Sequence, residues 1–71
     1  MNRQLKSIDE ISSSIKNARK LRHMTQEEAA ELLGYSERQY RRFENEGAYD
    51  IFVLSNIAEL FRVDLINILF K

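Results

Sequence analysis

Residues 25–45 have the sequence TQEEAAELLGYSERQYRRFEN, which predicts two short helices joined by a tight turn. Thr25 and Ser36 are each followed three residues later by Glu or Gln, the spacing of a capping box at the start of a helix. Gly34 follows the first apolar run, at the position where a left-handed C-terminal cap favours glycine. These signals predict helices over residues 26–33 and 37–45.

The connection between these two helices is too short for an antiparallel pair, because only Gly34 and Tyr35 lie before the cap at Ser36. The helices are therefore expected to cross steeply, with the small side chain of Ala30 where their backbones approach. This arrangement is a helix-turn-helix, in which the outer face of the second helix is free to project. The apolar residues expected to be at least partly buried on the first helix are Ala29, Ala30, Leu32 and Leu33.

Helical signals extend through the rest of the chain. Its 71 residues include no proline and only two glycines, and no sustained alternation of apolar and polar residues predicts a strand. Ser7 and Glu10 form a third capping-box pair, and Asp64 is a candidate cap for the last helix. We predict an all-α single domain over residues 1–71, a compact bundle of about five short helices with a flexible tail at residues 1–6. The expected helices cover residues 7–21, 26–33, 37–45, 52–61 and 65–70.

Composition excludes several classes of site. Cysteine is absent, which excludes disulfides and cysteine-ligated metal centres, and a single histidine excludes zinc sites built on several imidazoles. No apolar run approaches the roughly 20 residues that span a bilayer, and the N-terminal residues lead into no signal-peptide core. We expect a cytoplasmic protein without cofactor or metal. We expect no enzyme, because no catalytic constellation accompanies the acidic pair Asp9 and Glu10.

The formal net charge is zero, but the charges are unevenly distributed along the chain. Residues 1–25 hold six basic and two acidic side chains, whereas residues 26–50 hold three basic and seven acidic side chains. A neutral chain can still present a positive face if the fold gathers one set of charges on one side.

The second helix of the motif has the clearest candidate for such a face. With Tyr40 and Phe43 turned inward, its exposed residues are expected to include Glu37, Arg38, Arg41 and Arg42. Guanidinium groups present donors in a fork that suits guanine edges and phosphates. An ordinary solvated face is the alternative, since charged runs are common on helix surfaces.

The segments IKNARKLRHMTQEEAAELLGYSERQYRRFEN and LSNIAELFRV resemble the Cro and lambdoid-repressor type of helix-turn-helix domain, the XRE family. The resemblance covers residues 11–63. It implies a small transcriptional regulator of bacterial or phage type that binds double-stranded DNA sequence-specifically. In such repressors the second helix of the motif, here about Glu37–Asn45, lies in the major groove.

The resemblance also implies roles for individual residues. By this resemblance Gln26 and Asn45 contact phosphates. Glu37, Arg38 and Arg42 contact base edges, and Arg41 contacts either a base or the DNA backbone. Arg19 and Glu44 match a structural pair that fixes the angle at which the reading helix projects. The complete predicted DNA-binding set is Gln26, Ser36, Glu37, Arg38, Gln39, Arg41, Arg42 and Asn45.

Three features depart from the family pattern. Glu37 is acidic at a reading position, where it either accepts from a cytosine amino group or simply favours the helix N-terminus. Tyr40 is bulkier than the usual aliphatic residue, which indicates an altered core or a hydroxyl that reaches solvent. The loop at residues 46–50 lacks the usual basic residues, so we expect modest affinity.

An apolar C-terminal segment suggests a second surface. Ile66 and Phe70 are spaced i, i+4, and together with Phe52 they are expected to form the interface of a homodimer. A frayed end, a further domain or a partner protein over this surface are the alternatives. The whole chain also fits a different class, an antitoxin or antirepressor that keeps the helix-turn-helix frame as a protein-interaction module and reads little DNA.

Overall fold

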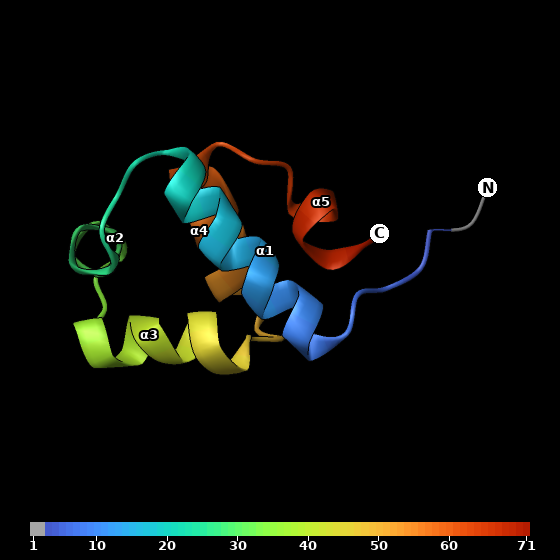
Figure 1. Ribbon diagram of the computed structural model, residues 1–71, viewed down its shortest axis with the longest axis horizontal. Helices are drawn as coiled ribbons and strands as arrows, with labels where there is room; N and C mark the ends of the chain where they lie inside the picture. The colour runs from blue at the N-terminus through green and yellow to red at the C-terminus, as the bar shows by residue number, and fades with distance from the viewer. Residues whose placement is uncertain (1–2) are drawn as a thin grey trace.

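The computed structural model describes residues 3–71, and Figure 1 shows them as a bundle of short helices. The five helices of this part of the chain are α1 (Ile8–Leu21), α2 (Gln26–Leu33), α3 (Glu37–Glu46), α4 (Ile51–Phe61) and α5 (Leu65–Leu69). The predicted all-α class is confirmed, and every predicted helix boundary lies within one residue of the observed one. Within residues 3–71, no helix has both the length and the apolar character needed to cross a bilayer.

Hydrogen bonds at the helix starts explain why these boundaries could be predicted. Ser7 and Thr25 each accept a bond from the backbone of the glutamate three residues later, and each glutamate accepts from the cap backbone at 2.9 Å. The third predicted box is only half correct. Ser36 Oγ accepts from Gln39 N at 3.1 Å, but within residues 3–71 the Gln39 side chain accepts no bond from the Ser36 backbone. Asp64 precedes α5 as predicted, without a side-chain capping bond.

The core forms where α1 meets α3, α4 and α5 (Figure 1). Its largest fully buried side chains are Ile11, Ile15, Tyr40, Leu54, Ile57, Phe61 and Ile68. The predicted burial of Leu32 is wrong, because 63% of this residue is exposed. The cause is helical geometry: α2 packs through Ala29 and Ala30, and Leu32 lies about 200° around the helix from Ala30.

Two glycines fix the position of α3. Gly34 has φ 81° and ends α2 in the left-handed conformation. The chain then turns so that α3 crosses α2: Figure 1 shows α2 end-on and α3 from the side. Gly47 has φ 76° at the other end of α3 and lies against the start of α1. A Cβ atom at Gly47 would approach Ile8 atoms to 2.7–2.8 Å, so only glycine fits there without rearrangement. Both ends of α3 are therefore tightly placed.

The predicted flexible tail is not observed over residues 3–6. Backbone bonds join Lys6 N to Leu69 O at 2.7 Å and Lys71 N to Gln4 O at 2.8 Å, around an isolated antiparallel bridge between Leu5 and Phe70. These bonds satisfy backbone groups that a free tail would leave to water. Residues 1 and 2 of the predicted tail lie outside the described residues.

Candidate nucleic-acid interface

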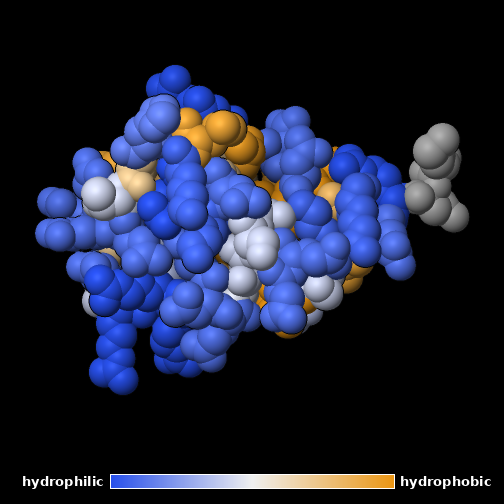
Figure 2. All heavy atoms as spheres, viewed as in Figure 1, coloured by the Kyte–Doolittle hydropathy of each residue, from blue (hydrophilic) through white to orange (hydrophobic). Residues whose placement is uncertain are grey.

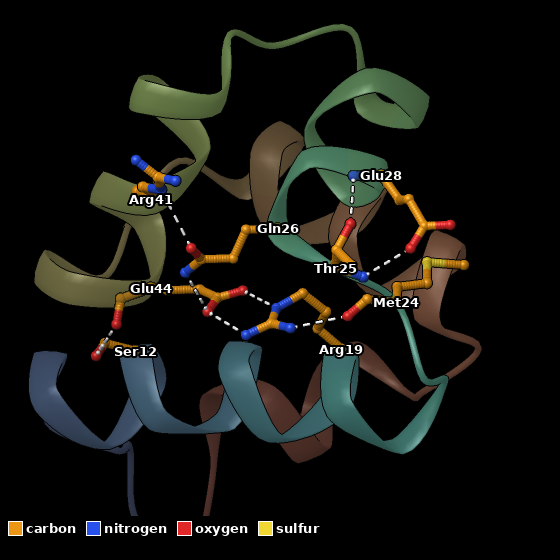
Figure 3. A network of polar contacts seen from close by, with 8 residues as sticks. All are labelled: Ser12, Arg19, Met24, Thr25, Gln26, Glu28, Arg41 and Glu44. Atoms are coloured by element: carbon orange, nitrogen blue, oxygen red, sulfur yellow. Dashed lines mark hydrogen bonds and ion pairs between the residues drawn. The ribbon is translucent and has the colours of Figure 1, made fainter.

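A buried ion pair joins α1 to α3. Arg19 Nε and Nη2 donate to the two carboxylate oxygens of Glu44 at 2.6 and 3.0 Å, and only 11% of the Arg19 side chain and none of the Glu44 side chain is exposed. Figure 3 shows two further bonds around the pair, from Arg19 Nη1 to Met24 O at 2.8 Å and from Ser12 Oγ to Glu44 O at 2.8 Å. The bidentate contact fixes α3 in both distance and angle relative to α1.

The electrostatics of this pair keep both groups charged. Burial acts to raise the pKa of Glu44, but the hydrogen bonds from Arg19, with smaller contributions from the neighbouring Tyr40 and from Gln26, outweigh it and lower that pKa below its ordinary value. The bond to Glu44 likewise raises the pKa of Arg19. Tyr40 lies beside the pair, fully buried, so its hydroxyl does not reach solvent, and burial raises its pKa. That hydroxyl has no hydrogen-bond partner among the described residues.

A chain of polar contacts leads from the buried pair to the surface. Gln26, the first residue of α2, donates from Nε2 to Glu44 Oε1 at 3.0 Å and accepts at Oε1 from Arg41 Nε at 3.2 Å (Figure 3). Arg41 Nη2 in turn pairs with the carboxylate of Glu37, one helical turn earlier. Spacing alone did not reveal this role of Gln26, because its partners are 15 and 18 residues away along the chain.

The outer face of α3 carries the predicted reading residues. Arg38, Gln39 and Asn45 are exposed, whereas Glu37 is half-buried. Arg42 Nε donates to Glu46 Oε2 at 3.1 Å, yet the Arg41 and Arg42 side chains stay 55% and 70% exposed. Exposed i, i+4 pairs contribute only about 0.3–0.5 kcal/mol, so a phosphate or base can displace them. Figure 2 shows hydrophilic side chains covering α3 and projecting below it.

Comparison with known proteins agrees with this geometry. A family model described as helix-turn-helix matches residues 15–67. The chain belongs to the helix-turn-helix family. This confirms the resemblance to Cro and lambdoid repressors, and the family is one of DNA-binding transcription regulators rather than enzymes. Neither the curated proteins nor the solved structures gave a match.

The three residues predicted to form the dimer interface differ in how exposed they are. Phe52 is 79% exposed at the start of α4, and Ile66 is also exposed. Phe70, expected on the same free surface, is partly buried because its backbone pairs with Leu5. The homodimer therefore remains a prediction that rests on Phe52 and Ile66.

Proposed function

We propose that this helix-turn-helix domain binds double-stranded DNA sequence-specifically, as a small cytoplasmic transcriptional regulator of the bacterial or phage type. Its α3 lies in the major groove, with Arg38 and Arg42 toward base edges and Asn45 toward a phosphate. The observation that carries the proposal is the set of exposed guanidinium groups on a helix whose ends and inner face are fixed. Such a helix offers donors to DNA without having to be ordered first.

The arginines differ in how free they are to read bases. Arg38 has no ion pair within residues 3–71, whereas Arg41 and Arg42 each pair with a carboxylate of α3. The carboxylates also place negative charge near the DNA, so the affinity expected for a single domain is modest. A homodimer compensates for this by reading two half-sites about 34 Å apart.

A salt titration tests the proposal. Preferred duplexes are first selected from a random pool, and their affinity is then measured at increasing salt by fluorescence anisotropy. Each phosphate neutralised by the protein contributes about −0.9 to the slope of log affinity against log salt. A steep negative slope and a reproducible preferred sequence are expected. A flat response, with tight binding to a protein instead, favours the antitoxin or antirepressor function.

A further inference from the structure

The amide of Gln26 is bonded on both sides by the protein itself. Its Nε2 donates to Glu44 Oε1 and its Oε1 accepts from Arg41 Nε (Figure 3). One N–H of this amide is left for the phosphate contact that the family resemblance implies. The internal bonds give Gln26 a second role, which a phosphate contact does not require.

The surroundings of the amide permit only one orientation. A carboxylate oxygen accepts and a guanidinium N–H donates, and neither group can do the reverse. A flipped amide would place Oε1 against the Glu44 carboxylate and Nε2 against Arg41, two repulsive contacts. Glu44 cannot move to relieve them, because its side chain is fully buried and held at both oxygens by Arg19. Gln26 Oε1 is therefore a fixed acceptor that faces α3.

Arg41 is held along one edge of its guanidinium group. Gln26 binds Nε and Glu37 binds Nη2, whereas Nη1 makes no bond to another described residue. More than half of the Arg41 side chain is exposed, so the outer end of the fork is open to a ligand. An arginine restrained in this way loses less side-chain entropy when it binds an anion or a base edge.

We propose that Gln26 is a positioning residue for DNA binding, which transmits the fixed geometry of the Arg19–Glu44 pair to the guanidinium of Arg41. This inference rests on the proposed function, because it assigns Arg41 a contact with DNA. It implies that α2 contributes to recognition through a side chain of α3, in addition to any bond of its own.

A double-mutant cycle on the selected duplex tests this role. Gln26→Met keeps the length of the side chain and removes its polar atoms. We expect it to weaken binding at least about threefold more when Arg41 is present than in the Arg41→Ala background, where only a phosphate contact of Gln26 itself can be lost. The matched control pairs Gln26→Met with Asn45→Ala, since Asn45 shares no bond with Gln26 among residues 3–71, and there the two effects should multiply.

Independent effects of Gln26→Met and Arg41→Ala would overturn the positioning role and leave the proposed function intact, since Gln26 then acts on DNA by itself. Failure of the unmodified protein to prefer any duplex would overturn both. NMR of the free protein gives a readout without DNA: the Arg41 Nε–H should exchange slowly with solvent, and faster in Gln26→Met. Fast exchange in the unmodified protein contradicts the proposal. If Gln26→Met does not fold, Gln26→Asn is judged by the same criteria, because it keeps the amide but shortens its reach.

Discussion

Replacing Glu44 by alanine should be the most destabilising single change at the α1–α3 contact. It removes two bonds from Arg19 and one from Gln26, and it leaves the Arg19 guanidinium buried with Met24 O as its remaining partner among the described residues. Removing one partner of a buried pair costs about 3–5 kcal/mol, because the other charge stays desolvated. The bond to Met24 and the residual exposure of Arg19 place the expected cost near the lower end, about 3 kcal/mol.

That cost is a large fraction of the free energy of unfolding expected for the whole domain. A stability of about 0.05–0.15 kcal/mol per residue gives a chain of this length roughly 4–11 kcal/mol in total. A cost of about 3 kcal/mol should lower the melting temperature by roughly 12–24 °C in a domain of this size. Urea unfolding followed by circular dichroism at pH 7 measures the change directly.

Glu46→Ala is the matched control, since it removes the carboxylate of the exposed pair with Arg42 on the same helix. Its expected cost is about 0.3–0.5 kcal/mol. If Glu44→Ala and Glu46→Ala cost the same within about 0.5 kcal/mol, the buried pair does not hold α3 in place and the reasoning is wrong.

Three further results are expected. Gly34→Ala should cost about 1–2 kcal/mol, because a Cβ at Gly34 meets only open space but the left-handed backbone still disfavours it. Gly47→Ala should cost more, because a Cβ at Gly47 also meets Ile8. Equal free energies of unfolding for the two variants would refute this. Because the pKa of Glu44 is lowered, its contribution to stability is complete above its ordinary pKa of 4.5 and is lost as the pH falls through the lower folded value. Glu44→Gln should therefore flatten this part of the stability–pH curve, and an unchanged curve would contradict the assignment. Arg42→Ala should weaken binding to the preferred duplex by about 1–3 kcal/mol and relax the preference at one base pair. An equal loss of affinity for a random duplex would indicate a phosphate contact instead.

The parts of the fold that sequence predicted are those with local causes. Capping at Ser7 and Thr25 involves partners three residues away, so the helix starts could be predicted from spacing alone. The buried pair of Arg19 and Glu44 was available only through family resemblance, because its members are 25 residues apart.

The features that were missed depend on how the helices pack. The bridge between Leu5 and Phe70 joins the two ends of the described chain, and no local pattern marks either residue as a strand. The exposure of Leu32 follows from which face α2 turns to the core, and that face is set by two alanines rather than by the leucine. Gln26 has the side chain that the family pattern predicts, but its bonds require α2 and α3 to be placed first.

Recognition of bases by the outer face of α3 is tested most directly by Arg38→Ala, since Arg38 is the arginine of that face without an ion pair in the described chain. The measurement is the ratio of affinities for the selected duplex and a scrambled duplex at one salt concentration. The ratio should fall about 5- to 150-fold, corresponding to about 1–3 kcal/mol, while the affinity for the scrambled duplex changes little. Equal weakening on both duplexes, with the ratio unchanged, would show that this face holds the phosphate backbone and does not read sequence.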